Sequence, residues 1–444
     1  MADHAVSRDA AVQAQLDRLW ALSPGADVLG LERITRLLAR LGDPHHALPP
    51  VFHVAGTNGK GSTCAYLRAA LEAAGYRVHA YTSPHLVRFN ERIRLAGKLI
   101  DDDALAPLLA EVLDVAGDIG ASFFEITTAA AFLAFARTPA DACVVEVGLG
   151  GRLDATNVLA APVACGIAAL GIDHQAFLGD TLAQIAAEKA GIAKPGVPLV
   201  TMRYPAPVAA VVAEAARKAD ARLLPAGVAW RHDVDPRAAR LTYTDPNGQV
   251  DLPLPALPGI HQADNLALAT AMLRHQQALP VPDTALDEAS RSARWPARLQ
   301  RLSPGPLTGP LSATPVWLDG GHNASAGEAI GAALARIIPP GQDRSLIVVM
   351  GMLANKDPAG LLAPFAAHVR ALIALPVPGH PHHTPEDLAE IAARLGIPRV
   401  HAAGSISDAF VLLRGIVQPA DTVLVAGSLY LAGEVLSAND ELPR

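Results

Sequence analysis

The sequence predicts an α/β protein of two domains, each built around a mainly parallel β-sheet. Its 444 residues exceed what one hydrophobic core usually supports. Short runs rich in valine and isoleucine alternate with longer segments rich in alanine and leucine, which is the order typical of strand–helix units around a parallel sheet. A stretch rich in proline and glycine near residues 295–310 predicts a linker between the two domains.

The first predicted domain contains alternating strands and helices followed by a different pattern. Apolar runs predict strands at Val51–Ala55, Arg77–Tyr81, Ala142–Val147, Val163–Ala168 and Pro198–Met202. The segments between them predict helices at Ser62–Ala74, Thr127–Ala136, Leu182–Gly191 and Ala206–Ala219. Short strands around a Pro-Asn-Gly turn then predict a small β-rich insertion at residues 221–258.

The second predicted domain is a smaller α/β unit. Its strands are expected at Val316–Asp319, Ser345–Met350, Ala371–Leu375 and Thr422–Ala426, with helices between them. No internal repeat occurs at periods of about 20 to 50 residues, so the two domains are expected to differ in structure.

Composition excludes several classes of protein. Hydrophobic residues make up 51% of the chain and charged residues 18%, which is typical of an ordered globular protein. A net charge of −7 provides no basic surplus for a nucleic-acid partner. No run reaches the roughly 18 apolar residues of a membrane helix, and no apolar leader is visible. Three widely spaced cysteines favour a reducing compartment, so we expect a soluble, cytoplasmic protein without a membrane partner.

The segment HVAGTNGKGSTCAYL, residues 53–67, predicts a phosphate-binding loop. A strand, a glycine-rich turn and a helix start direct backbone N–H groups and a helix N-terminus towards one point, and Lys60 adds a positive charge. The spacing departs from the usual phosphate loop, because Val54 replaces the first glycine and Gly61 replaces the hydroxyl residue. A glycine-rich turn with an exposed lysine is the structural alternative.

Ten segments in the same order resemble the Mur-ligase superfamily, and within it the folylpolyglutamate and dihydrofolate synthases. They are LGLERI (29–34), GTNGKGS (56–62), YTSPHLVRFNERI (81–93), EVGLGGRLDATN (146–157), GIDHQAFLGDT (171–181), EKAGIAK (188–194), HQADNLALA (261–269), WPARLQ (295–300), LDGGHNASA (318–326) and GMLANKD (351–357). The resemblance implies a P-loop ATPase domain at residues 1–298 and a Rossmann-like glutamate-ligase domain at residues 299–444.

The resemblance also implies a nucleotide site. The residues expected to bind ATP are Gly56, Thr57, Asn58, Gly59, Lys60, Gly61, Ser62, Asn265, Arg298 and Asp319. Asparagine would contact the polar edge of the nucleotide, arginine its phosphates and aspartate the ribose hydroxyls. The family usually has glycine where Ala297 precedes Arg298.

Two Mg²⁺ ions are implied as cofactors. Glu146 ends an apolar strand at a sheet edge, where a carboxylate suits a hard cation. By resemblance, Ser83 and Glu146 hold the ion that bridges the β- and γ-phosphates, and His174 holds a second ion. Lys189 resembles a lysine that is carbamylated to become an anionic ligand. Without the resemblance, the same four residues are interpreted as turn-forming or capping residues and a helix-end cation.

A pterin site is implied by further matching residues: Phe124, Leu153, Asp154 and Ala155. Aromatic stacking and a carboxylate hydrogen bond suit a pterin ring. A core phenylalanine and a turn aspartate are the structural alternatives. The family aspartate before LGLER is replaced by Val28, with Asp27 one place earlier.

Four residues in other matching motifs are expected near the glutamate or nucleotide cleft: His322, Asn323, Lys356 and Ser428. The segment GHPHHTP, residues 379–385, has several histidines but no family counterpart. It lies in a proline-rich loop, and we do not expect it to bind a metal.

These residues predict an ATP-dependent amide ligase that joins L-glutamate to dihydropteroate and to folates through an acyl phosphate. Lys60, His174 and Lys189 are the expected catalytic residues, and the resemblance implies a monomer. A monofunctional folylpolyglutamate synthase and a cell-wall Mur ligase acting on a UDP-sugar peptide are alternatives within the superfamily. A P-loop kinase or motor-type ATPase and a non-catalytic nucleotide-binding module are alternatives from other classes.

Overall fold

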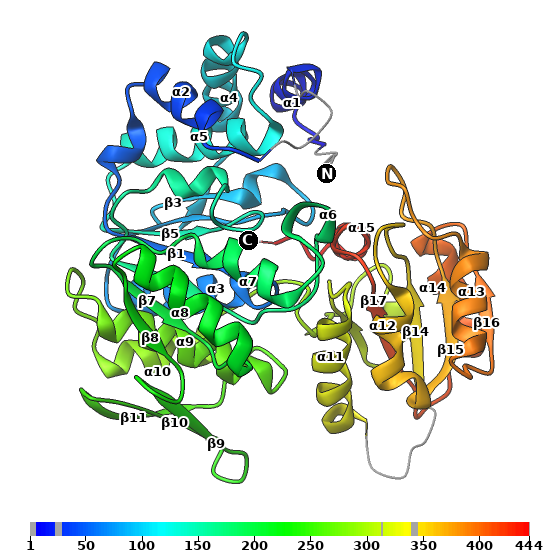
Figure 1. Cartoon of the computed structure of the whole chain (residues 1–444). Helices are drawn as coiled ribbons and strands as arrows, with labels where there is room; N and C mark the ends of the chain where they lie inside the picture. The colour runs from blue at the N-terminus through cyan, green and yellow to red at the C-terminus, as the bar shows by residue number, and fades with distance from the viewer. Residues whose placement is uncertain (1–5, 23–28, 312–313, 339–344, 444) are drawn as a thin grey trace. The chain divides into compact units, whose positions relative to one another are not determined.

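The computed structural model describes residues 6–22, 29–311, 314–338 and 345–443, which form two compact units (Figure 1). The first unit contains the chain up to Ala256 together with Gln262–Arg294. The second contains Leu257–His261 and Trp295–Pro443. Each unit has its own sheet, which confirms the predicted α/β class.

The sheet of the first unit has eight strands in the order β4-β3-β2-β5-β1-β6-β7-β8. All neighbours from β2 to β8 pair in parallel, whereas β3 and β4 are antiparallel. The strands are β1 (Val51–Ala55), β2 (Val78–Tyr81), β3 (Ile93–Leu95), β4 (Lys98–Leu99), β5 (Ala142–Glu146), β6 (Ala164–Ile167), β7 (Pro198–Thr201) and β8 (Arg222–Pro225). The central strands β1, β5 and β6 are buried along their whole length, as expected for a parallel sheet covered on both faces.

Helices cover both faces of this sheet. They are α1 (Ala10–Leu22), α2 (Glu32–Arg40), α3 (Lys60–Ala73), α4 (Asp102–Ala116), α5 (Phe123–Arg137), α6 (Gln175–Leu178), α7 (Leu182–Ala190), α8 (Ala206–Lys218), α9 (His261–His275) and α10 (Asp283–Ser292). Short 3₁₀ helices lie at η1 (Pro44–Ala47), η2 (Phe89–Arg92) and η3 (Ala155–Val158). Alternate residues of β1 face opposite sides, so Val51, His53 and Ala55 share one face.

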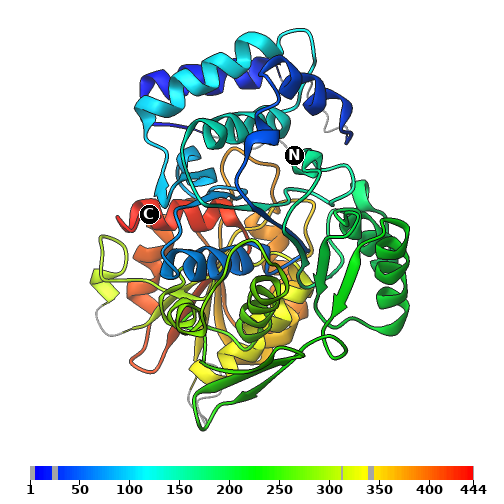
Figure 2. The ribbon, with the colours of Figure 1, turned by 90° about the vertical axis from the view of Figure 1, so that its left-hand side faces the viewer.

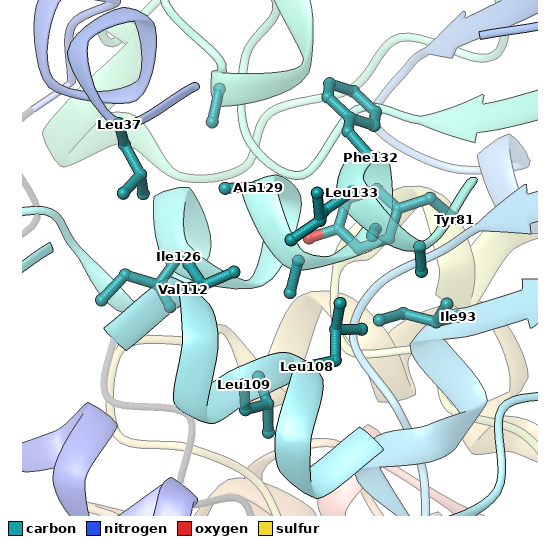
Figure 3. Close-up of a cluster of buried hydrophobic side chains, with 14 of the residues drawn as sticks. Leu37, Tyr81, Ile93, Leu108, Leu109, Val112, Ile126, Ala129, Phe132 and Leu133 are labelled. Atoms are coloured by element: carbon teal, nitrogen blue, oxygen red, sulfur yellow. The ribbon is translucent and has the colours of Figure 1, made fainter. Parts of the chain in front are cut away.

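The largest described core lies between this sheet and a double layer of helices. Helix α5 packs on the sheet, and α1, α2 and α4 cover α5 (Figure 2). Figure 3 shows part of this core, to which Ile126 and Phe132 from α5, Leu109 and Val112 from α4 and Tyr81 from β2 belong. A second core joins the sheet to α7 and α8.

The predicted β-rich insertion is confirmed, but its first strand joins the main sheet. Strand β8 pairs in parallel with β7. The separate antiparallel sheet contains only β9 (Arg231–Asp235), β10 (Arg240–Asp245) and β11 (Gly248–Pro253). Its β10–β11 turn contains the predicted Pro-Asn-Gly sequence and has Gly248 at φ +115°.

The second unit has a six-stranded sheet in the order β12-β13-β17-β14-β15-β16. Only β12 is antiparallel to its neighbour. The strands are β12 (Gln300–Arg301), β13 (Val316–Leu318), β14 (Leu346–Met350), β15 (Val369–Ala374), β16 (Val400–Ala402) and β17 (Thr422–Ala426). The helical segments are η4 (Gly309–Leu311), α11 (Ala324–Ile337), α12 (Pro358–Leu362), η5 (Ala363–His368), α13 (Pro385–Arg394), α14 (Ile406–Ile416) and α15 (Leu429–Ala438).

Differences from the predicted elements have local causes. The helix predicted at Thr127–Ala136 begins at Phe123, because Ser122 and Glu125 form a capping box. The helix predicted to begin at Ser62 begins at Lys60, directly after Gly59 in the left-handed region. The apolar runs of the sequence do not predict α4 or the antiparallel strands β3 and β4. Within the described ranges, no helix has both the length and the apolar character needed to cross a bilayer.

The packing of α4 on α5 predicts the effect of a core truncation. Leu109 is fully buried, so Leu109→Ala should lower the free energy of unfolding by about 2 to 5 kcal/mol through lost contacts and a cavity. Val228 is 85% exposed, and Val228→Ala should change stability by less than about 0.5 kcal/mol. Urea unfolding followed by circular dichroism measures both changes; equal effects would contradict this description of the core.

Candidate functional site

Four neighbouring strands place their carboxyl ends at one edge of the first sheet. Strands β2, β5, β1 and β6 are adjacent and parallel. The segments that follow them begin at Thr82, Val147, Gly56 and Ala168. Ligand sites of parallel α/β sheets form at this edge, and it carries most of the predicted site residues of the first unit.

The loop between β1 and α3 has the backbone geometry of an anion cradle. Gly56 and Gly59 have φ values of +152° and +83°, which are accessible mainly to glycine. A Cβ atom on Gly59 would lie 2.3 Å from Oδ1 of Asn265, and one on Gly56 would lie 2.9 Å from Cβ of Ala168. The N–H groups of Thr57 and Asn58 donate to the carbonyl of Ala169, at 2.8 and 3.2 Å. The loop is therefore fixed against the segment after β6.

The start of α3 supplies the other part of the cradle. Lys60, Gly61 and Ser62 form its first turn, and Gly61 and Ser62 are buried. Amide groups in a first helical turn have no acceptor within the helix and favour an anion.

Two lysine side chains meet at this loop. Lys60 Nζ donates to the carbonyl of Gly56 at 3.1 Å, and Lys189 Nζ donates to the same oxygen at 3.0 Å. Burial and, to a smaller extent, the positive charge of Lys60 lower the pKa of Lys189 to about 7, while Asp173 and Asp154 oppose the shift. Lys189 lies at the end of α7. The arrangement places two amino groups beside the glycine loop, and a pKa of about 7 makes a part of Lys189 neutral near neutral pH.

Glu146 ends β5, and Ser83 lies in the segment that follows the adjacent strand β2. The backbone N–H of Ser83 points at Oε2 of Glu146, at 3.3 Å, and Glu146 is buried. A carboxylate beside a serine hydroxyl offers hard oxygen ligands to a divalent cation.

His174 lies after β6, in a segment that is tied to the glycine loop. The hydroxyl of Thr57 donates to the carbonyl of Gly171 at 3.0 Å and accepts from the N–H of Gly171 at 3.1 Å. His174 itself has φ +52° and caps α6, and its N–H donates to Asp173 Oδ1 at 2.8 Å. Asp173 acts electrostatically on Lys189, so this segment and Lys189 face the same region.

Asp154 is held by a buried hydrogen-bond chain. Its carboxylate accepts from the N–H of Leu149 at 2.8 Å and from both the N–H and the hydroxyl of Thr156. His53 Nε2 lies 2.8 Å from Thr156 Oγ1. Because the hydroxyl proton goes to Asp154, His53 donates to Thr156. Burial raises the pKa of Asp154, and the hydrogen bonds from Thr156 and Leu149 oppose this shift.

The remaining predicted pterin-site residues lie close to Asp154 along the chain or in space. Phe124 is partly buried in the first turn of α5, and its ring lies 5.9 Å from that of Tyr81. A Cβ atom on Gly148 would lie 2.4 Å from the Phe124 ring, so glycine lets the ring approach the loop after β5. Leu153 and Ala155 flank Asp154, and Ala155 begins η3.

Three residues of this site were missed by the sequence analysis: His53, Thr156 and Gln262. Gln262 accepts a hydrogen bond from the side chain of the buried Asn265, at 3.0 Å, and so orients the amide beside Gly59. All three lie inside the motif segments of the sequence, but only their hydrogen-bond partners in the structure separate them from core residues. Asp27 and Val28 lie outside the described residues.

In the second unit, Asp319 organises the predicted nucleotide residues. Its carboxylate accepts from the N–H of Leu299 at 2.8 Å and of Gly321 at 2.7 Å. Arg298, next to Leu299, donates to the carbonyl of Ala297 at 2.9 Å. Ala297 and Leu299 have φ values of +53° and +44°, so this segment keeps a left-handed backbone even though alanine replaces the glycine of the family.

The other predicted residues of the second unit follow β13, β17 and β14, whose carboxyl ends share one edge. His322 Nδ1 lies 3.0 Å from the carbonyl of Gly320, Asn323 caps α11, and Ser428 caps α15. Lys356 lies on the loop after β14.

The histidine-rich segment 379–385 supports the loop that carries Lys356. His383 Nε2 lies 2.9 Å from the carbonyl of Lys356, and its N–H donates to Met352. His382 forms a bridge with Leu353, and the His380 ring stacks on Tyr430 at 3.8 Å.

Comparisons with known proteins agree with the two-unit α/β fold. A family model described as Mur ligase, glutamate ligase domain, matches residues 307–429. The chain is 36% identical over 413 residues to the dihydrofolate synthase/folylpolyglutamate synthase of Escherichia coli (strain K12), covering 93% of this chain and 92% of that protein.

Two solved structures are similar over nearly the whole chain. Escherichia coli FolC in complex with DHPP and ADP has a TM-score of 0.87 at 33% identity and covers 97% of each chain. A bifunctional folylpolyglutamate synthase/dihydrofolate synthase with Mn, AMPPNP and L-glutamate bound has a TM-score of 0.84 at 32% identity, covering 96% of this chain and 97% of that one.

The buried position of Lys189 predicts a pH-dependent stability. The folded state lowers its pKa from 10.5 to about 7, so between these values the unfolded chain binds more protons and the free energy of unfolding rises with pH. Lys189→Met should weaken this rise and should be more stable than the parent protein at about pH 6, where the burial cost of the charge is fully present. Urea midpoints at about pH 6 and about pH 9 measure the difference. The exposed Lys218→Met is the control; an unchanged pH slope in Lys189→Met would contradict the shifted pKa.

Proposed function

This chain belongs to the folylpolyglutamate synthase/dihydrofolate synthase family of ATP-dependent glutamate ligases, and we propose that it joins L-glutamate both to dihydropteroate and to folates. The observation that carries the proposal is the meeting of a glycine loop, two lysines and a buried glutamate at one sheet edge. This arrangement suits a polyphosphate and a divalent cation.

The nucleotide of the proposed reaction is ATP. The amide groups of Gly56–Ser62 and the ammonium of Lys60 would bind its phosphates, and Asn265 would contact the nucleotide beside Gly59. This assignment is supported by the left-handed glycines and by the 2.3 Å approach of Asn265 Oδ1 to a Cβ position on Gly59, which leaves no room for a side chain. From the second unit, Arg298 and Asp319 are the proposed phosphate and ribose contacts.

The residues present fit a divalent cation, and we propose Mg²⁺ at two positions. Ser83 and Glu146 would hold one ion, and His174 the other, with Lys189 as a carbamylated ligand. A bound Mg²⁺ would neutralise negative charge on the phosphates during transfer. The support for Lys189 is its pKa of about 7, since only the neutral amine can attack carbon dioxide.

The acceptor side of the proposed site contains Phe124, Leu153, Asp154 and Ala155. The Phe124 ring would stack on the pterin, and the Asp154 carboxylate would accept hydrogen bonds from its edge. The chain from His53 through Thr156 holds this carboxylate in one orientation. A preorganised acceptor loses little free energy when it meets its ligand.

The proposed reaction proceeds in two steps. A carboxylate oxygen of the acceptor attacks the γ-phosphorus of ATP, which gives an acyl phosphate and ADP. The amine of L-glutamate then attacks the acyl carbon, and phosphate leaves from the tetrahedral intermediate. Lys60 offsets charge on the transferred phosphoryl group. Neither step requires a nucleophilic side chain of the protein.

The bifunctional reaction, rather than polyglutamate extension alone, is supported by the buried Asp154 and by Phe124. A monofunctional folylpolyglutamate synthase is the second candidate, since a relative named folylpolyglutamate synthase from Lacticaseibacillus casei is 34% identical over 91% of this chain. We also propose that the protein is a monomer and that it works in the cytoplasm. Its proposed domains are residues 1–298 and 299–444.

Removal of the Lys60 charge should affect the reaction and leave the fold intact. Lys60→Ala should lower kcat for ATP-dependent ligation by about 100-fold or more, since it removes a charge aimed at the transferred phosphoryl group. Lys98 is exposed on β4, and Lys98→Ala should be as active as the parent protein. Phosphate release, with circular dichroism of each variant, measures this; near-normal turnover by folded Lys60→Ala would remove Lys60 from the mechanism.

Substrate omission separates the candidate functions. Phosphate release should require both L-glutamate and a pteroate or folate acceptor, and mass spectrometry should find one added glutamate on dihydropteroate and further glutamates on a reduced folate. Product from the folate alone would identify the monofunctional enzyme. Phosphate release without glutamate would instead support an ATPase or kinase and would refute the ligase.

A further inference from the structure

Three metal-binding side chains lie together on one turn that the proposed reaction does not use. Asp43, His45 and His46 each offer a ligand atom, and the three atoms all lie within 4.8 Å of one another. The turn lies between α2 and β1, and it contains η1. Among the described residues, this is the one group of three or more histidine, cysteine or acidic side chains with such spacing.

The backbone of this turn is fixed by contacts that do not involve the three side chains. The N–H of Asp43 donates to Leu38 at 2.8 Å, and the N–H of His46 donates to Asp43 at 3.0 Å. Asp43 has φ +53°, and Pro44 is buried at the first position of η1, which packs against α5. Backbone hydrogen bonds and the packing of Pro44 therefore hold the turn, and the side chains of Asp43, His45 and His46 are not needed for this.

The three side chains also lack polar partners. Within the described part of the chain, none of them makes a side-chain hydrogen bond, and Asp43 does not cap η1 through its carboxylate. The centroids of the two imidazole rings lie 4.0 Å apart, with the ring planes tilted by 44°, and His45 Nδ1 is buried without a partner. A buried polar atom without a partner costs about 1 to 3 kcal/mol. Such an atom is seldom left unsatisfied unless a water or an ion pairs with it.

We propose that Asp43, His45 and His46 bind a divalent transition-metal ion of the zinc class, separately from the sheet edge that carries Glu146. Two imidazole nitrogens and one carboxylate select zinc, nickel or copper over magnesium or calcium, which prefer oxygen ligands. Three protein ligands leave a fourth position for water. His46 is exposed, so an ion can reach the site from solvent.

Bound zinc would fix the turn between α2 and β1. All three ligands lie within four consecutive residues, so the ion would close a small ring and hold both imidazoles. Because η1 packs on α5, the ion should raise the thermal midpoint of the protein. Ligase activity should not require it, since none of these residues belongs to the proposed catalytic machinery.

The test is calorimetric titration of Zn²⁺ into the full chain, freed of metal with a chelator and kept in excess Mg²⁺ so that oxygen sites are filled. One equivalent should bind. His46→Ala should weaken binding by about tenfold or more, since it removes a ligand. Asp43→Asn should also weaken it while keeping the turn, because asparagine tolerates the left-handed backbone. His401→Ala, which changes a half-buried histidine of β16, should bind as the parent does.

A spectroscopic measurement identifies the ligands directly. Cu²⁺ bound in place of Zn²⁺ should show coupling to two histidine nitrogens by electron paramagnetic resonance, and His46→Ala should reduce this to one. Absence of the zinc equivalent, or equal binding by the parent, Asp43→Asn and His46→Ala proteins, would overturn the proposal. The parent protein should catalyse ligation equally with and without Zn²⁺, so a failure of this proposal leaves the ligase assignment unaffected.

Discussion

The carbonyl oxygen of Gly56 accepts hydrogen bonds from two lysine ammonium groups, and the arrangement of the site depends on this meeting. Two positive charges this close repel each other, and burial adds the cost of desolvation. Both effects lower the pKa of Lys189 to about 7, so the side chain can lose its proton and avoid part of the cost of a buried charge. The negative charge of a polyphosphate beside the loop would offset the remaining repulsion.

The two lysines can reach the same oxygen only if α3 and α7 are held in a fixed relative position. Lys60 begins α3, whereas Lys189 ends α7, and they reach the same oxygen only because β1 and β6 are parallel neighbours. The same strand order places Glu146 of β5 beside Ser83 after β2. The helical double layer of α1, α2, α4 and α5 buries one face of the sheet and provides the rigidity that such a site needs.

Buried polar side chains also hold the predicted site residues in position. His53 lies on a fully buried strand, and its hydrogen bond reaches Asp154 through Thr156. In the second unit, the Asp319 carboxylate holds the backbone on both sides of its own loop and beside Arg298. In segment 379–385, His383 and His382 contact the loop of Lys356. Among the residues that the structure describes, the side chains that approach one another with metal-site spacing are Asp43, His45 and His46.

The sequence by itself determined the α/β class, the central strands and the glycine loop, because apolar runs and left-handed glycines are local properties. It also identified the family, because ten collinear motifs survive in the chain. Only the tertiary structure decided that α5 begins at Phe123, that β8 extends the main sheet, and that His53, Thr156 and Gln262 support site residues. These facts depend on burial and on contacts between residues far apart in the chain, and a linear pattern contains neither.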